Sequence, residues 1–382
     1  MPWQEVSVMG QREAFVRLAS LEGANRRELC RRFGIHPDTG YKWLRRRAAD
    51  ETDLTDHSRR PHRSPHQTEA ALEAKVLAVR DAHPAWGARK LAACLKRENI
   101  APPAASTVHA ILRRNDRVTE TAGQGAPTTR FEKAAPNLLW QMDFKGWVKL
   151  TNGTRCHPLT VVDDHSRYLV NLTACANQTE ETVRGHLETA FRHHGLPEAM
   201  FVDNGSPPAF ARGRLWGGGP GERWTHFGVW LLKLGVRVLH SRPYHPQSRG
   251  KNERFHRTLN KEVLSLTCFR GLNEAQRAFD AWLPIYNDER PHEALGMAVP
   301  ADRYRPSPRP MPARLMEPAY DEGDIVRKVG TTKAYVQFKG RAWPVGQAFF
   351  GERVAIRPRG ADGRYGIFFG AHRIGDIDLA MK

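Results

Sequence analysis

The stretch Arg249-Gly-Lys-Asn-Glu-Arg-Phe-His-Arg-Thr-Leu259 places one carboxylate, that of Glu253, among cationic side chains at the start of a predicted helix. The apolar residues that follow recur at helical spacing, at Phe255, Leu259, Val263 and Leu266. Such a helix buries one face and exposes the acid and its basic neighbours on the other. Because a carboxylate repels phosphate, this face suits a polyanion only when a metal ion lies between them. The alternative for this stretch alone is a solvated helix with an Arg–Glu pair.

The composition favours a nucleic-acid partner. The chain has 382 residues, a length that predicts two to four domains, and its 40% of hydrophobic residues is enough for globular cores. Lysine and arginine number 59 against 41 aspartate and glutamate residues, which gives a formal net charge of +18. A charge of that size repels itself unless phosphates neutralise it.

Cysteine usage and hydropathy argue against other classes of protein. The five cysteines have no Cys-x-x-Cys spacing, so we expect buried reduced thiols rather than a zinc site or a disulfide framework. The N-terminus lacks the apolar core of a signal peptide, and no run reaches the roughly 18 apolar residues of a membrane span. We therefore expect a soluble intracellular protein without a membrane partner.

Residues 1–49 predict an all-α DNA-binding domain of the helix-turn-helix type. Cys30, Gly34 and Trp43 have the spacing of that motif, with a small residue where helices cross and a glycine for the turn. The predicted DNA contacts lie on the third helix, at Thr39, Lys42, Arg45 and Arg46. A plain three-helix core with a solvated outer face is the alternative.

Residues 50–66 lose this periodicity and form a predicted basic linker. Its cations are expected to follow a DNA backbone or enter a minor groove, at Arg59, Arg60 and Arg63. A merely solvated linker is the alternative.

Residues 67–118 repeat the helical pattern and predict a second helix-turn-helix domain. Ser106 is expected to cap its last helix after Pro102-Pro103. The residues expected to face outward toward DNA are His109, Arg113 and Arg114. Two units in tandem read a longer site than one.

After a second linker at 119–136, residues 137–305 predict an α/β domain. Strands are expected at 139–150, 156–162, 168–174, 199–203 and 236–239, with helices at 180–194 and 224–234. Asn152-Gly153 is a hairpin signal. Three antiparallel strands, a helix and a strand that can pair in parallel are typical of an α/β sheet.

A Pro-rich linker at 306–318 leads to a small β-rich module at 319–382. Strands are expected at 325–329, 335–345, 352–358 and 365–369, and a five-stranded barrel fits them. Composition leaves open whether this module binds DNA, contacts protein or only packs.

Three carboxylates are distinguished by their context. Asp143 lies within an apolar strand, where an acid is costly unless it is paired or metal-bound. Asp203 ends a strand and Glu253 starts a helix, so the three can converge if the two strands are neighbours. Three hard oxygen donors suit Mg²⁺, and two such ions serve phosphodiester displacement. Turn capping for Asp203 and a buried hydrogen bond for Asp143 are the alternatives.

A rival acidic cluster follows at Asp163-Asp164-His165-Ser-Arg167. Because it lies between two predicted strands, we expect it to have a structural role in the turn.

Three blocks resemble the catalytic motifs of bacterial insertion-sequence transposases of the DDE, or retroviral-integrase, superfamily: Trp140-Gln-Met-Asp-Phe-Lys-Gly146, Val202-Asp-Asn-Gly205 and Gly250-Lys-Asn-Glu-Arg-Phe-His-Arg-Thr-Leu259. Flanking signatures are similar as well: Met9-Gly-Gln-Arg12, Ser58-Arg-Arg-Pro-His62, Trp86-Gly-Ala-Arg-Lys-Leu91 and Tyr286-Asn-Asp-Glu-Arg-Pro-His-Glu-Ala-Leu295. The resemblance therefore covers nearly the whole chain.

The resemblance implies a ribonuclease-H-like core whose metal-binding catalytic triad is Asp143, Asp203 and Glu253. It implies two Mg²⁺ ions per site, with Mn²⁺ as a substitute, and an SH3-like C-terminal barrel. Such enzymes bind the terminal inverted repeats of their element, cut there, and use the 3′-hydroxyl to attack target DNA. The cations beside Glu253, at Lys251, Arg254 and Arg257, are further expected DNA contacts.

The reaction also predicts a homodimer or higher oligomer on double-stranded DNA, in the cytoplasm and associated with the nucleoid. Two features depart from the family pattern. The gap between Asp203 and Glu253 is long, which we attribute to the Gly-rich insert at 213–221 and the helix after it, and the His/Cys zinc module of retroviral integrases is absent. The alternatives are a catalytically silent DNA-binding regulator and a nuclease without strand transfer.

Overall fold

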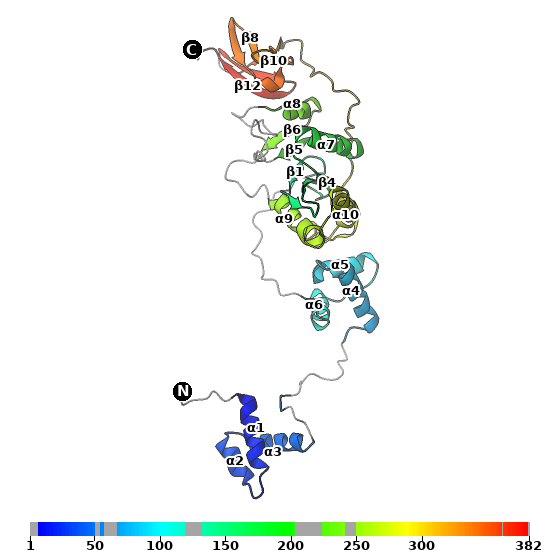
Figure 1. Ribbon diagram of the computed structural model, residues 1–382. Helices are drawn as coiled ribbons and strands as arrows, with labels where there is room; N and C mark the ends of the chain where they lie inside the picture. Colours follow the sequence, from blue (N-terminus) through cyan, green and yellow to red (C-terminus); the bar gives the residue numbers. More distant parts are fainter. Residues whose placement is uncertain are drawn as a thin grey trace. The chain divides into compact units, whose positions relative to one another are not determined.

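The computed structural model describes residues 7–49, 54–56, 67–118, 132–202, 224–240, 250–360 and 362–380 (Figure 1). The chain divides into two compact units, Met1–Gln67 and Thr68–Lys382. None of the helices in the described ranges has the length and apolar content that a membrane crossing requires. All five cysteines are free thiols; four are buried, as predicted, and Cys268 is exposed.

The first unit contains the three predicted helices, α1 (Val8–Ala19), α2 (Arg26–Arg32) and α3 (Pro37–Ala48). The side chains of Ser7 and Asn25 cap the first two, and Pro37 occupies the first turn of the third. The apolar core consists of Phe15, Val16, Ala19, Cys30, Trp43 and Leu54. Leu54 lies in the predicted linker 50–66, where a single apolar residue produces no periodicity.

Two glycines shape the turn between α2 and α3. Gly34 has a φ of 65°, the left-handed conformation that the predicted turn needs. Gly40 lies where α3 crosses the other helices, and a Cβ there would stand 2.6 Å from Cys30 Sγ and 2.7 Å from Phe15 Cζ. The predicted helix-turn-helix geometry is confirmed, and the close crossing depends on Gly40 as well as on the small Cys30.

The second unit begins with α4 (Ala70–Ala82), α5 (Ala88–Arg97) and α6 (Ala105–Arg114). Their buried core consists of Val76, Trp86, Leu91, Cys94, Leu95, Val108, Ile111 and Leu112. The predicted cap at Ser106 is wrong, because the helix begins one residue earlier and its N-cap is Ala104. Ala105 continues the helix backward from Ser106, which therefore lies inside the first turn.

The centre of the second unit is a mixed sheet with the strand order β4-β3-β1-β5-β6. Its strands are β1 (Trp140–Phe144), β3 (Arg155–Asp163), β4 (Leu169–Cys175), β5 (Ala199–Val202) and β6 (Arg237–His240). β4, β3 and β1 pair antiparallel, whereas β1, β5 and β6 pair in parallel. The predicted sequence of three antiparallel strands followed by a parallel one is confirmed.

The predicted strand 139–150 is interrupted, because it resumes as β2 (Val148–Lys149). Phe144 pairs with Leu159 and Val148 pairs with Cys156, so three residues lie opposite two of β3. One extra residue in one strand is a β-bulge, which bends the strand just after Asp143.

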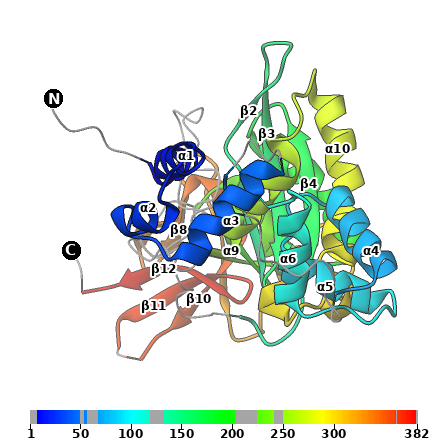
Figure 2. The same cartoon turned by 90° about the horizontal axis from the view of Figure 1, so that it is seen from below.

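Helices cover both faces of this sheet. One face packs against α7 (Glu180–His194) and α8 (His226–Lys233). The other packs against α9 (Gly250–Leu259), the π-helix η2 (Asn260–Leu264) and α10 (Leu272–Pro284). Figure 2 shows α10 alongside β4, a contact that the packing confirms. This layered arrangement is the ribonuclease-H-like architecture that the resemblance implied.

Short elements follow α10 and complete this layer, namely η3 (Ile285–Glu289), η4 (Glu293–Leu295) and α11 (Pro300–Arg303). The predicted linker then begins as a strap on the surface of the core. Leu196 N–H donates to Arg309 O at 2.7 Å, and Ser307 N–H donates to His194 O at 2.7 Å. The guanidinium of Arg309 donates to the carbonyls of Pro197 and Leu234. Backbone pairing of this kind cannot be seen in a Pro-rich composition.

The C-terminal module contains a four-stranded sheet, β12-β11-β10-β7, and a separate hairpin, β8-β9. Its strands are β7 (Ile325–Lys328), β8 (Tyr335–Phe338), β9 (Arg341–Pro344), β10 (Arg353–Pro358), β11 (Arg364–Phe369) and β12 (His372–Asp378). The predicted run 335–345 is the hairpin, and β12 was not predicted. The predicted closed barrel is not found, because no pairing joins the two sheets among residues 324–360 and 362–380.

Candidate active site

Asp143 lies near the end of β1, the central strand of the sheet, and is half-buried. On one side β1 pairs with β3, so that Asp143 stands opposite Thr160. On its other side β1 pairs in parallel with β5, which places Gln141 beside Phe201. The prediction that the two strands are neighbours is confirmed, because β5 pairs with β1 as far as Phe201 and ends at Val202, the residue that precedes Asp203. Asp203 itself lies outside the described residues.

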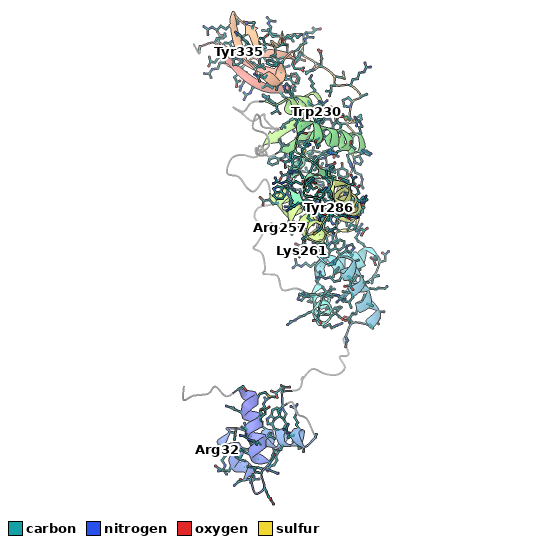
Figure 3. All side chains as sticks on the ribbon, in the orientation of Figure 1. Arg32, Trp230, Arg257, Lys261, Tyr286 and Tyr335 are labelled. Carbon is teal, nitrogen blue, oxygen red and sulfur yellow. The ribbon has the colours of Figure 1, made fainter. Side chains whose placement is uncertain are left out.

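Glu253 lies in the first turn of α9, and its side chain is exposed, as are those of Arg254 and Arg257. Asn252, Phe255, His256 and Leu259 form the buried face of the same helix. The predicted amphipathic helix is confirmed through Val263. Leu266 departs from it with 64% of its surface exposed, because the helix changes to a π-helix at 260–264 and ends there. Figure 3 marks Arg257 on α9 and Lys261 on that continuation.

The buried face of α9 contacts β1 and β3 next to Asp143. The Thr160 hydroxyl donates to the backbone carbonyl of Asp143 at 2.9 Å and lies 3.0 Å from Nε2 of His256. Burial and, to a lesser degree, the nearby Lys145 together lower the pKa of His256 to about 4. A neutral imidazole therefore joins the Glu253 helix to the sheet at neutral pH. The sequence pattern did not indicate this role for His256.

The acidic cluster after β3 is structural, as predicted. Asp163 Oδ1 accepts from the Ser166 amide at 2.8 Å and its hydroxyl at 2.6 Å, which closes the turn. Burial raises the pKa of Asp163. Asp164 is fully buried, accepts from the side-chain amide of Gln141 at 2.6 Å, and forms an ion pair with Lys251.

The predicted DNA contacts of the first domain lie at the outer side of α3. Lys42 and Arg45 are exposed, whereas Thr39 and Arg46 are half-buried. Lys42 also forms an ion pair with Asp56 at 3.6 Å, and Arg46 donates to Thr55 O at 2.7 Å. Two of these cations therefore also hold the chain at 54–56. Arg59, Arg60 and Arg63 lie outside the described residues.

In the second domain, His109 and Arg113 are exposed on α6, as predicted. The expectation that Arg114 faces outward is wrong, because its guanidinium forms a two-point ion pair with Glu73 of α4. This partner lowers the pKa of Glu73. The sequence pattern missed the pair because Glu73 lies on another helix. On α9, Arg254 forms an ion pair with Glu293 at 3.4 Å.

The donor set fits a hard divalent cation. Asp143 and Glu253 offer carboxylate oxygens, which Mg²⁺ prefers over nitrogen and sulfur ligands. Among the described residues no group of three acidic, histidine or cysteine side chains is arranged to hold a metal ion. The third predicted ligand, Asp203, lies outside the described residues.

Models of known families match most of the chain. An integrase core domain matches residues 133–246, and a second model of that description matches 234–300. The C-terminal domain of IS481 family transposases matches residues 324–382. A helix-turn-helix domain matches residues 11–62, and a homeodomain-like domain matches 39–112.

Curated relatives include proteins of insertion elements. The chain is 28% identical over 249 residues to the insertion element IS407 uncharacterized 31.7 kDa protein of Burkholderia multivorans, covering 62% of this chain and 81% of the relative. It is 26% identical over 298 residues to the insertion element IS476 uncharacterized 39.2 kDa protein of Xanthomonas euvesicatoria, covering 76% and 79%. A similar solved structure is the HTLV-2 integrase catalytic core domain in complex with magnesium, with 18% identity, 45% of this chain and 99% of that chain covered, and a TM-score of 0.33.

Proposed function

Since the chain belongs to the integrase-core superfamily that includes insertion-element transposases, we propose that it is a metal-dependent DNA transposase. It binds the terminal inverted repeats of its own element, cuts the DNA at the element ends and joins the freed ends to target DNA. Asp143, Asp203 and Glu253 are the proposed catalytic triad.

One observation supports this proposal: β1, which bears Asp143, adjoins both the helix that bears Glu253 and the strand that ends just before Asp203. β5, which ends one residue before Asp203, pairs in parallel with β1, which bears Asp143. The helix that bears Glu253 packs on β1 from outside the sheet. Asp143 and Glu253, distant in sequence, thus belong to adjoining elements. The carboxyl ends of sheet strands, where β1 carries Asp143 and β5 precedes Asp203, are where open sheets bind their ligands.

The three carboxylates would hold two Mg²⁺ ions, with Mn²⁺ as a substitute. Bound in such a site, these ions activate the attacking oxygen and stabilise the leaving oxygen of an in-line phosphodiester displacement. Water attacks first, breaks the P–O bond at the element end and leaves a 3′-hydroxyl. That hydroxyl then attacks a target phosphodiester, its proton passes to solvent, and the target 3′-oxygen departs. No covalent bond between protein and DNA forms.

The cationic side chains supply the DNA binding. The proposed contacts are Thr39, Lys42, Arg45, Arg46, Arg59, Arg60, Arg63, His109, Arg113, Arg254 and Arg257. Because each phosphate contact releases counterions, end binding should weaken steeply with salt. Joining two ends at once also requires at least a dimer on the DNA.

The test is strand transfer by the full chain with a labelled duplex from the element's own end. We expect joined product with Mg²⁺ and none with Ca²⁺, and loss of that product in Asp203→Asn while end binding persists. Asp280→Asn, a matched change on the exposed side of α10, should join normally. End binding without cleavage or joining in the wild type would instead identify a silent regulator, and cleavage without joining would identify a nuclease.

A further inference from the structure

Two polar bridges connect the strand that bears Asp143 with the helix that bears Glu253. Both start from β3 or from the turn that follows it. Each bridging side chain contacts β1 on one side and α9 on the other. Neither bridging residue belongs to the proposed triad.

Thr160 forms the first bridge and is fully buried. Its hydroxyl has one proton, which it donates to the Asp143 carbonyl at 2.9 Å. Its oxygen, 3.0 Å from Nε2 of His256, must therefore accept a hydrogen bond from the Nε2–H. The bridge thus runs from α9 through one hydroxyl to the backbone of Asp143 itself.

Asp164 forms the second bridge and is also fully buried. It accepts from Gln141, two residues before Asp143 on β1, at 2.6 Å. It also pairs with Lys251, two residues before Glu253, whose side chain is only 18% exposed. The amide of Lys133 completes the set at 2.8 Å. These three donors satisfy the buried carboxylate, and losing one of them is costly.

We propose that Thr160 and Asp164 are positioning residues that fix the Glu253 helix against the Asp143 strand, so that the acids are held at metal-binding distance. The inference rests on the proposed function. Lys251 and His256 flank Glu253 and are about 7.5 Å apart along the helix axis. Two attachments at that separation fix both the axial position and the rotation of the helix. They also resist the mutual repulsion of the carboxylates before a cation arrives.

The first bridge is tested with Thr160→Val, which removes the hydroxyl but keeps the volume, and with Thr160→Ser, which restores it. Substitution of a residue that orients a metal ligand typically lowers metal affinity by about 10- to 100-fold. We expect Thr160→Val to weaken Mn²⁺ binding, measured by electron paramagnetic resonance on the full chain, by about 10-fold. Hydrogen exchange of residues 250–259 should become faster in the absence of metal and DNA. End binding should be unchanged.

The matched control is Thr173→Val on the neighbouring strand β4, where the hydroxyl donates to Asn171 instead of to β1 or α9. It should leave Mn²⁺ binding and exchange in 250–259 at wild-type values, as should Thr160→Ser. Equal loss of thermal stability in both valine variants, with Mn²⁺ affinity unchanged in both, would mean that Thr160 only packs. That result would overturn the proposal.

Lys251→Met tests the second bridge against its reading as a phosphate contact. A positioning role predicts weaker Mn²⁺ binding and an unchanged slope of log Kd for end DNA against log salt. A phosphate contact predicts a slope smaller by about one and unchanged Mn²⁺ binding. Lys261→Met, on the exposed side of η2, is the control and should alter neither quantity.

These readouts separate this proposal from the transposase itself. If the wild type binds Mn²⁺ and protects residues 250–259 from exchange but never joins DNA, the proposed function is rejected. The bridges are still supported in that case if Thr160→Val lowers both the Mn²⁺ affinity and the protection of residues 250–259. If the wild type joins DNA, but Thr160→Val and Lys251→Met leave the Mn²⁺ affinity and the protection of residues 250–259 unchanged, only the bridges are rejected.

Discussion

Two three-helix regions of this chain share one sequence pattern and differ in what they pack against. Helices α1–α3 bury their apolar residues among themselves and with Leu54, inside the unit Met1–Gln67. Helices α4–α6 build a similar core but belong to the same compact unit as the mixed sheet of the integrase core. The pattern of buried positions thus predicts a helical core without predicting its neighbours.

The second region is attached to the integrase-core domain through α5. Ile285 packs against its core, and the Cys94 thiol lies 3.9 Å from the carbonyl of Glu289. Arg97 forms an ion pair with Asp302 at 2.7 Å. Burial at this contact lowers the pKa of Lys90 to about 8. The comparison teaches that the outward residues of a helical domain decide whether it is independent.

The largest expected effect is that of Gly40→Val in the first domain. A side chain there overlaps Cys30 and Phe15, and overpacking of this kind costs about 3 kcal/mol. Hydrogen exchange should show loss of protection in residues 8–48 and no change in 68–382. Gly87→Ala in the second domain is the control, since nothing lies within 4 Å of its Cβ position. Loss of protection in both units would contradict their independence.

Lowering the pH should destabilise the second unit more than the first. His256 has a folded pKa of about 4 against 6.5 unfolded, so its contribution to stability is complete above pH 6.5 and is lost as the pH falls toward 4. At pH 5 the free energy of unfolding of the second unit should be about 2 kcal/mol lower from this residue. The first domain's described histidine, His36, is exposed.

Urea unfolding at pH 7 and pH 5, monitored by hydrogen exchange in each unit, measures this difference in the free energy of unfolding. His256→Gln, which keeps a donor but does not titrate, should make the loss in the second unit smaller by about 2 kcal/mol. The remaining loss comes from other histidines whose pKa burial also lowers, His292 among them. A pH response of equal size in residues 8–48 would show that buried histidines are not its cause.

The ion pair within the second domain should matter less. Glu73 and Arg114 have side chains only 18% and 25% exposed, and two hydrogen bonds join them. Glu73→Gln removes the charge and keeps the shape, so we expect protection in α4–α6 to fall by about 1 kcal/mol. An unchanged exchange rate in those helices would mean that the pair does not stabilise the domain and that Arg114 is available to contact DNA.

The smallest effect should come from the docking ion pair. Arg97 and Asp302 are 43% and 41% exposed, so solvent screens their attraction and Arg97→Met should cost about 0.5 kcal/mol or less. Thermal unfolding at low and high salt measures it, and the difference from wild type should vanish at high salt. A larger, salt-independent loss would indicate that the Arg97 stem contributes through apolar packing.

Much of the fold and part of the site follow from local sequence. The apolar and β-branched residues at 156–162 and the helical spacing at 180–194 each depend on side chains close in the chain, and both elements form where predicted. The exposed acid of α9 follows from the same kind of spacing. Ser106 was misplaced because the cap depends on where the helix begins, and spacing alone does not fix that residue.

By itself, the sequence determined which residues are buried in each element and which acids stand out from an apolar setting. Periodicity and the cost of burying charge act within a few residues, so they are visible in the chain. Only the tertiary structure decided that Thr160 and Asp164 each join the Asp143 strand to the Glu253 helix, and that Glu73 engages Arg114. Those contacts join residues that are far apart in the chain, and closeness in space produces no periodic pattern in the sequence.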